Sequence, residues 1–245
     1  MKTNPASKSR RRPRLARALF AMGALAGGFT AVVGFLHTPY GRPLMGRLGM
    51  SCPAKRASPA AVEALRLRGV GALRGTALAP ARPALGLKLD VSRTADVEAW
   101  TRARGLGCED RQRPSHLLVC SNVPASALTS TASGAASEQS KHGDGAVDEV
   151  TFAFAPDSRL VAVDTFRRAL TGPRACELFA QIADGLTGAL GSRGERVGEA
   201  TPAYLEGAPL RTARLDYRFA DYLATVTAMN LSGRVALREQ YLSAL

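Results

Sequence analysis

The sequence predicts an α+β fold in which an N-terminal transmembrane helix precedes an antiparallel sheet packed on two helices. Three observations lead to this prediction. Residues 18–36 carry no charged side chain, segments of alternating apolar residues occur as hairpins and as a final three-strand meander, and residues 94–104 and 175–190 have apolar residues at helical spacing. The order of these elements gives two units, each a helix followed by strands, that share one sheet.

The composition is that of a folded bacterial protein. Hydrophobic residues make up 46% of the 245 residues, too many for a wholly disordered chain, and 28 Arg against five Lys is typical of a GC-rich genome. The net charge of +13 is uneven: residues 1–17 carry seven basic groups and no acidic one, whereas residues 108–245 carry 14 basic and 16 acidic groups. Because the part with the strongest folding pattern is slightly acidic, the sequence does not predict nucleic-acid binding.

Residues 18–36 are predicted to be a transmembrane anchor or a signal sequence. A helix of these 19 residues spans about 28 Å, close to the hydrocarbon thickness of a bilayer. Residues 1–17 form a basic tail of the kind that stays in the cytoplasm, so we expect a single-pass inner-membrane protein whose carboxyl-terminal domain lies in the periplasm. Gly23, Gly27 and Ala31 repeat every four residues, a spacing that would allow a weak homodimer of anchor helices, although a chain rich in Ala and Gly also produces it by chance.

Three alternatives to an uncleaved anchor stay open. A cleaved signal peptide would use the small-x-small pattern at residues 24–26, which lies inside the apolar stretch. Lipidation at Cys52 would need an aliphatic residue that the preceding positions lack. A twin-arginine export signal would use Arg10 and Arg11, whose neighbours match the pattern poorly. Cleavage would leave the folded domain exported rather than anchored.

The chain after the anchor is expected to begin with an irregular stalk and a hairpin. Residues 37–83 are rich in Pro and Gly and contain one short helix, which begins at Ser58 and Pro59. The α+β domain is predicted at residues 84–245. It opens with a strand at 84–90 and the helix at 94–104, in which Trp100 is expected in the core.

The next segments predict a hairpin at 106–123, a flexible loop at 124–147 that is rich in Ser, Ala, Thr and Gly, and a second hairpin at 150–163. The helix at 175–190 follows, and the meander occupies residues 213–241. The polar face of the sheet is expected to carry Arg214, Asp216 and Arg218.

The four cysteines predict one disulfide. Cys108 and Cys120 lie symmetrically about the turn of the first hairpin, so they face each other if its strands are antiparallel. In an oxidising compartment we expect a bridge that contributes about 2–4 kcal/mol, and buried free thiols are the alternative. Cys52 and Cys176 could pair, Cys52 could form an intermolecular link, or both could stay free, because spacing does not fix connectivity.

Motifs of several enzyme classes are missing from the sequence. It contains no GxxxxGK[ST], no GxGxxG after a strand, no Gly-x-Ser-x-Gly and no CxxC, and none of its three His residues has a metal-ligand partner at helical spacing. We therefore expect no cofactor, no metal and no catalytic residue. Asp216 and Asp221 bracket a strand end and are the candidates for an acid–base pair, but strand-face solvation and turn formation explain them more simply. The densest aromatic cluster is expected in the core and comprises Tyr217, Phe219, Tyr222 and Tyr241.

Two segments resemble a known family. Thr94-Ala95-Asp96-Val97 at the start of a helix and the hairpin at residues 150–161 resemble the small SmpA/OmlA-type (BamE-like) lipoproteins, which assist outer-membrane barrel assembly, and similar α/β repeats occur in β-lactamase-inhibitor proteins. The resemblance covers under half of the chain, which lacks a lipobox and has an additional helix and meander. It implies a protein-binding role outside the cytoplasm.

These observations predict a membrane-anchored extracytoplasmic protein that binds another envelope protein and has no catalytic activity of its own. One alternative is an enzyme with an unrecognised site. Another is a structural envelope protein that contacts lipid through the basic stretch at residues 42–82.

Overall fold

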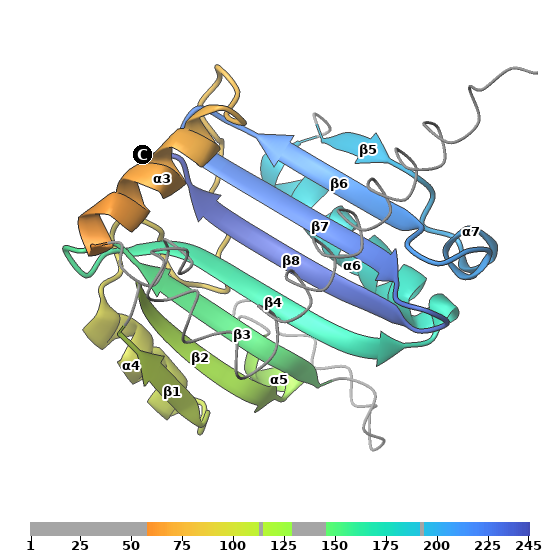
Figure 1. The fold of residues 1–245 in the computed structure, drawn as a ribbon, viewed down its shortest axis with the longest axis horizontal. Coiled ribbons are helices and arrows are strands. Elements are labelled where there is room, and N and C mark those ends of the chain that lie inside the picture. Colours follow the sequence, from red (N-terminus) through yellow and green to blue (C-terminus); the bar gives the residue numbers. More distant parts are fainter. Residues whose placement is uncertain (1–57, 113–114, 129–145, 192–193) are drawn as a thin grey trace, which may run out of the picture. The chain divides into compact units, whose positions relative to one another are not determined.

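In the residues that the structure describes, eight antiparallel strands form one sheet (Figure 1). The structure is a computed structural model, and it describes residues 58–112, 115–128, 146–191 and 194–245. In chain order the strands are β1 (Cys108–Arg111), β2 (His116–Val123), β3 (Val147–Phe154), β4 (Leu160–Leu170), β5 (Glu195–Val197), β6 (Thr212–Arg218), β7 (Tyr222–Asn230) and β8 (Val235–Ser243).

The strand order across the sheet is β1-β2-β3-β4-β8-β7-β6-β5, so two four-strand meanders meet along β4 and β8. Each meander follows a helix in the chain: α4 (Thr94–Ala103) precedes the first and α6 (Gly172–Leu190) precedes the second. The short helices α5 (Ala125–Leu128) and α7 (Pro202–Glu206) lie in strand connections. The predicted α+β class, the two hairpins and the final meander are therefore confirmed.

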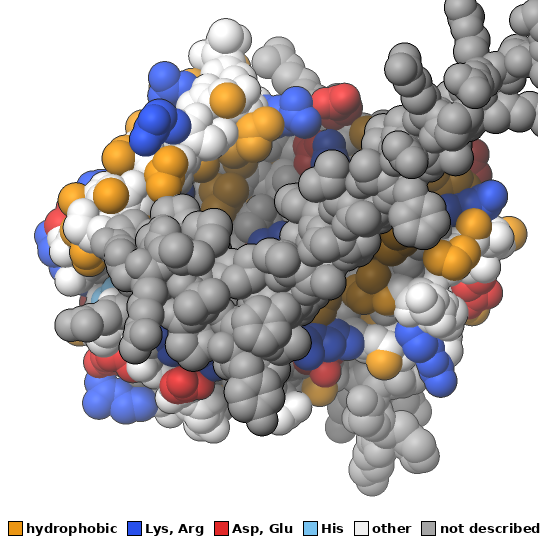
Figure 2. Space-filling model, viewed as in Figure 1, with side chains coloured by type: hydrophobic (Ala, Val, Ile, Leu, Met, Phe, Trp, Pro, Cys, Tyr) orange, Lys and Arg blue, Asp and Glu red, His pale blue; other side chains and the backbone are white. Residues whose placement is uncertain are grey.

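The helix α3 (Pro59–Gly71) lies on the opposite face of the sheet from α4 and α6, across the end where β7 begins and β8 ends (Figure 1). It begins as predicted, because the Ser58 side chain accepts a hydrogen bond from the backbone N–H of Ala61 at 3.2 Å. Val70 is its one buried residue and packs against Leu223 and Ala244. Hydrophobic and basic side chains are both visible at the surface over this helix (Figure 2).

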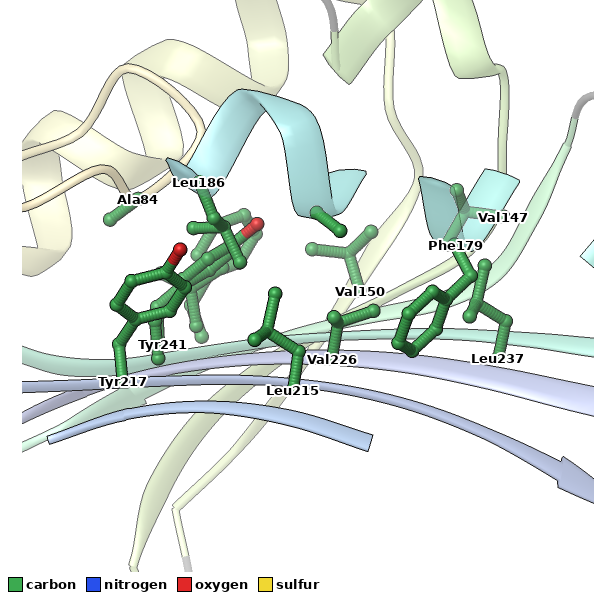
Figure 3. Packing of buried hydrophobic residues seen from close by; sticks show 14 of the residues in the cluster. Ala84, Val147, Val150, Phe179, Leu186, Leu215, Tyr217, Val226, Leu237 and Tyr241 are labelled. Carbon is green, nitrogen blue, oxygen red and sulfur yellow. The ribbon is translucent and has the colours of Figure 1, made fainter. Parts of the chain in front are cut away.

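The main core lies between the sheet and α6. Phe179 and Leu186 of α6 point toward Leu215, Val226 and Leu237 of the sheet (Figure 3). The aromatic cluster predicted for the core is buried there, with exposed fractions of 0–6%: it comprises Tyr217, Phe219, Tyr222 and Tyr241.

The other predicted core aromatic, Trp100 of α4, packs against the first meander of the sheet. Its ring meets Phe152 of β3 edge-on, with the ring centroids 5.7 Å apart. The guanidinium of Arg104 lies 4.1 Å from the Trp100 ring centroid. Helix α4 therefore covers the first meander on the same face on which α6 covers the second.

The prediction of a strand at residues 84–90 is wrong. Leu85, Gly86 and Asp90 have φ angles of 55°, 80° and 65°, so the segment forms consecutive turns rather than an extended strand. Ala84, Leu87 and Leu89 are nevertheless buried against the main core; these burials account for the apolar pattern. Turns and a strand can place side chains in a core with the same alternation, because only backbone angles distinguish them.

Residues 58–83, which were predicted to belong to the stalk, lie in the same compact unit as the sheet. The backbone N–H of Gly75 donates to the carbonyl of Phe219 at 3.2 Å, and that of Ala220 donates to the carbonyl of Ala77 at 2.7 Å. The Tyr222 hydroxyl donates to the carbonyl of Pro83 at 2.6 Å. These contacts join sequence-distant segments that no local pattern connects.

The anchor predicted at 18–36, with its Gly23, Gly27 and Ala31, lies outside the described residues. In the ranges that are described, no helix is long and apolar enough to cross a membrane. Most of the loop predicted at 124–147 also lies outside them, although α5 and the start of β3 occupy its two ends.

Candidate functional site

The face of the sheet opposite α6 carries a group of paired charges, which we call the arginine band: Arg214, Arg218, Arg238, Asp164 and Asp216. Alternation along each strand places these residues opposite the core side chains of β6, β4 and β8. The expected polar face with its three charged residues on β6 is therefore present, and it extends across the sheet to β4 and β8.

Asp164 of β4 is held by two side chains of β8. The Nε of Arg238 donates to both carboxylate oxygens, at 3.0 and 2.9 Å, and its Nη2 donates to Oδ2 as well. The side-chain amide of Gln240, the cross-strand partner of Asp164, donates to Oδ2 at 3.1 Å. The hydrogen bonds to Asp164 raise the pKa of the Arg238 guanidinium above its ordinary value.

Asp216 of β6 forms the second centre of the band. Its Oδ2 lies 2.7 Å from Nη2 of Arg214 and 3.3 Å from Nη2 of Arg218, and its Oδ1 accepts a hydrogen bond from the Thr225 hydroxyl at 2.9 Å. Nη1 of Arg218 is also 3.7 Å from the carboxylate of Glu195 on the edge strand β5. Each aspartate therefore fixes the positions of arginine head groups above a rigid strand.

The two centres lie in one row across the sheet. Asp216, Thr225, Gln240 and Asp164 are successive cross-strand partners on β6, β7, β8 and β4. The aspartates are three strand spacings apart, which corresponds to about 14 Å. Their side chains are 6% and 21% exposed, whereas those of the three arginines are 41–50% exposed. The charge that the band presents outward is therefore mainly positive, while the compensating carboxylates lie beneath it.

A second charged network lies on the core face of the same central strands. Nη1 of Arg167 donates to Oε1 of Glu239 at 2.5 Å, and the hydroxyl of Thr165 donates to the same oxygen at 3.0 Å. The hydroxyl of Tyr241 donates to Oε2 at 2.9 Å, and burial, followed by the charge of Glu239, raises the pKa of Tyr241 well above its ordinary value. Because these residues are buried, the network joins the two meanders and does not form a binding surface.

A pocket of about 310 Å³ opens where α3 begins, beside the β1–β2 connection and the β3–β4 turn. Nε2 of His116 lies 3.0 Å from Oδ1 of Asp110, and the His116 ring centroid lies 4.8 Å from that of Phe154. This contact with Asp110 is close but does not have the geometry of a hydrogen bond, so among the described residues the nitrogen has no hydrogen-bond partner. Glu63 in the pocket wall is paired with Arg66 at 2.8 Å, so its carboxylate already has a partner, and Asp110 is not among the residues that line the pocket.

The candidate acid–base residues Asp216 and Asp221 have separate partners. Asp221 accepts a hydrogen bond from the backbone N–H of Ala79 at 2.9 Å and lies 3.9 Å from Nε of Arg82. These contacts hold the 72–93 segment against the β6–β7 turn, whereas Asp216 belongs to the arginine band. Nothing in their geometry points to a shared proton.

The predicted hairpin disulfide, Cys108–Cys120, is confirmed: the two residues are direct cross-strand partners on β1 and β2 and are joined by an S–S bond. Cys176 on α6 has a free thiol, whose pKa is raised first by burial and then by the charge of Glu206. Cys52 lies outside the described residues, so a Cys52–Cys176 pair stays a prediction.

Sequence reasoning missed Asp164 because the return strand was expected to end at residue 163, and it missed Arg238, on the last predicted strand, because the pairing of β4 with β8 was not predicted. The pattern at Val163, Thr165 and Arg167 continues the alternation of that strand, but with polar residues on its core side. In the part of the chain that is described, no group of three or more His, Cys, Asp or Glu side chains could hold a metal ion. No protein-family model, curated protein or solved structure matches this chain.

Proposed function

We propose that this protein is a membrane-anchored, extracytoplasmic docking protein whose arginine band binds an acidic surface of another envelope protein. The observation that carries the proposal is the arrangement of three half-exposed guanidinium groups over two largely buried carboxylates on one rigid sheet. Arginine presents planar donors to carboxylates and is enriched where binding energy concentrates in protein interfaces. Because the aspartates already orient these groups, docking costs less side-chain entropy.

The edges of the sheet favour recognition through its face. The edge strands β1 and β5 have four and three residues, and both carry charged side chains. Short, charged edges oppose the addition of a further strand from another chain. A partner is therefore expected to contact side chains on the face of the sheet opposite α6, which we call the open face, rather than to extend the sheet.

The location rests on separate features of the chain. The uncharged segment 18–36 behind a basic tail favours an inner-membrane anchor, and the hairpin disulfide is typical of proteins that fold in an oxidising compartment such as the periplasm. Cleaved export would bring the same domain to the same compartment. The alternative of an enzyme draws on the pocket that His116 lines, where Nε2 of His116 lies near Asp110, and a reaction dependent on His116 would favour it.

The proposal is tested by photo-crosslinking of the full-length chain in its native bacterium. A crosslinking amino acid at Thr227, on the open face between β6 and β8, is expected to form an adduct with one envelope protein. The same group at Gln181, on the exposed side of α6, is the matched control and is expected to form none.

The specificity of the adduct is tested by neutralising charge. The double variant Arg214→Gln, Arg238→Gln is expected to weaken binding at least about thirtyfold, as for loss of an interface hot spot, with greater residual binding at low salt. Arg196→Gln on the edge strand changes an exposed arginine outside the band and is expected to leave binding unchanged. Equal adducts at Thr227 and Gln181, or a cytoplasmic chain with a reduced hairpin, would overturn the proposal.

A further inference from the structure

Helix α3 combines an ion pair on its inner side with exposed leucines: Val70 is its one buried residue, Glu63 and Arg66 are partly buried, and Leu65 and Leu67 are exposed. Nε and Nη2 of Arg66 each donate to the carboxylate of Glu63 at 2.8 Å, and Nη1 donates to the carbonyl of Ser243 at 2.7 Å. These bonds use Arg66 and Glu63 to hold α3 against the end of β8. Arg68 is the remaining charged residue of the helix, and it is exposed.

Four leucines of α3 and of the segment that follows it are exposed, and we call them the leucine patch: Leu65, Leu67, Leu73 and Leu78. Their exposed fractions are 58%, 40%, 51% and 74%. Hydrophobic and basic side chains alternate over this part of the surface in Figure 2. Single exposed leucines are ordinary, but four within 14 positions, two on α3 and two in the segment after it, indicate a surface that is covered in the working protein.

The charge around the patch identifies what covers it. Arg68 and Arg74 are exposed beside the leucines, and residues 64–89 contain no Asp or Glu. Leucines that enter the boundary of the acyl chains, with arginines beside them at phosphate level, are the pattern of a segment that lies in the membrane interface. An apolar protein partner would explain the leucines but not the complete lack of acidic residues.

The position of α3 in the chain also favours a bilayer. Ser58, which begins the helix, follows the end of the predicted anchor at Leu36 by 22 positions. Such a connection can extend to at most about 75 Å, so α3 is able to reach the membrane surface. A tether of this length keeps the patch at high effective concentration near lipid, so even weak affinity suffices for binding.

We infer that the leucine patch, with Arg68 and Arg74, lies on the anionic headgroup surface of the bilayer that holds the anchor. This inference rests on the proposed anchor at residues 18–36. Helix α3 packs on the same face of the sheet as the arginine band, at the end where β7 begins and β8 ends. The membrane contact thereby orients the docking face relative to the bilayer.

The test uses the full-length chain with Cys52→Ser and Cys176→Ser, reconstituted in lipid nanodiscs with the hairpin disulfide intact. Ala64→Cys on α3 carries a fluorophore, and Ala99→Cys, an exposed alanine on α4, is the matched control. Discs of phosphatidylcholine are compared with discs that also contain phosphatidylglycerol, each with brominated acyl chains as quencher. We expect quenching at position 64 in anionic discs, less in neutral discs, and none at position 99.

A charge variant measures the arginine contribution. Arg68→Gln with Arg74→Gln is expected to lower the equilibrium constant for membrane binding of α3 about 25-fold, since one basic residue near an anionic surface contributes about fivefold. Unquenched label at position 64 in discs that do contain the chain would overturn this inference and leave the anchor standing, as would burial of that label by a second copy of the chain. A chain that does not enter discs at all would overturn the anchor, and the inference with it.

Discussion

Replacing Glu239 by Gln would leave the guanidinium of Arg167 in the core without a counter-charge. The amide has the shape of the carboxylate, and its oxygen can still accept the hydrogen bonds from Arg167 and Thr165. The amide nitrogen takes the place of Oε2, so the Tyr241 hydroxyl then accepts a hydrogen bond instead of donating one. The change otherwise removes only the charge. Arg167 and Glu239 are 8% and 6% exposed, so water does not compensate the remaining cation.

The expected loss is about 3–5 kcal/mol in the free energy of unfolding, as for a buried ion pair that loses one partner. The double variant Arg167→Met, Glu239→Met removes both charges and keeps the volume filled, so it is expected to recover most of that loss. The matched control is Asp164→Asn, which breaks the pair with Arg238 on the open face of the same two strands. Because Arg238 is half exposed, this change is expected to cost at most about 1 kcal/mol.

Urea denaturation is the suitable assay, because urea, unlike guanidinium, does not screen charge. Fluorescence of Trp100, the single tryptophan, reports unfolding of the α4–β3 contact. Equal losses in Glu239→Gln and Asp164→Asn would refute the reasoning, since they would mean that the core pair is as well solvated as the surface pair. A double variant less stable than Glu239→Gln would refute it too, because the pair would then be net stabilising relative to apolar side chains.

Three further predictions test other parts of the fold. Reduction of the hairpin disulfide, which closes a separation of 12 residues, is expected to lower the free energy of unfolding by about 3 kcal/mol in urea titrations with and without reductant. Gly75→Ala is expected to cost about 1–3 kcal/mol, because its Cβ would lie 2.3 Å from the backbone oxygen of Arg218, while Gly71→Ala, with open space around it, is the control and is expected to change thermal stability little. The raised pKa of Cys176 means less thiolate at a given pH, so its alkylation near pH 8 is expected to be slower than that of a fully exposed cysteine. The alkylation is expected to accelerate in Glu206→Gln, and an unchanged rate in that variant would contradict the assigned cause.

Local patterns predicted the elements that short-range physics controls. The alternation at residues 150–163 and 213–241 identified the strands, and the spacing of Cys108 and Cys120 about a turn identified their bridge, because register in a hairpin follows from its turn. The helix α6 ends at Gly191, with φ of 83°, as predicted, but it begins at Gly172 rather than Ala175. Its first N–H is satisfied by Glu206, 34 residues away, which no local signal indicates.

Periodicity failed where backbone angles or distant contacts decided the outcome. Residues 84–90 alternate like a strand, yet they form turns whose side chains still enter the core. Segment 72–83 looked like part of an irregular stalk because its hydrogen-bond partners lie more than 130 positions further along the chain. The prediction of a membrane anchor at residues 18–36 rests on sequence alone, and it depends on the length of the segment and its lack of charged residues.

By itself the sequence determined the kinds of element, the hairpin disulfide and the uneven distribution of charge, since each follows from residues within a few turns of one another. Only the tertiary structure decided that β4 lies beside β8. That single neighbour relation unites Asp164 with Arg238 on one face and Arg167 with Glu239 on the other, across 74 and 72 positions of chain. Strand neighbours so far apart are selected by burial of the whole sheet against α4 and α6, and no local pattern encodes that choice.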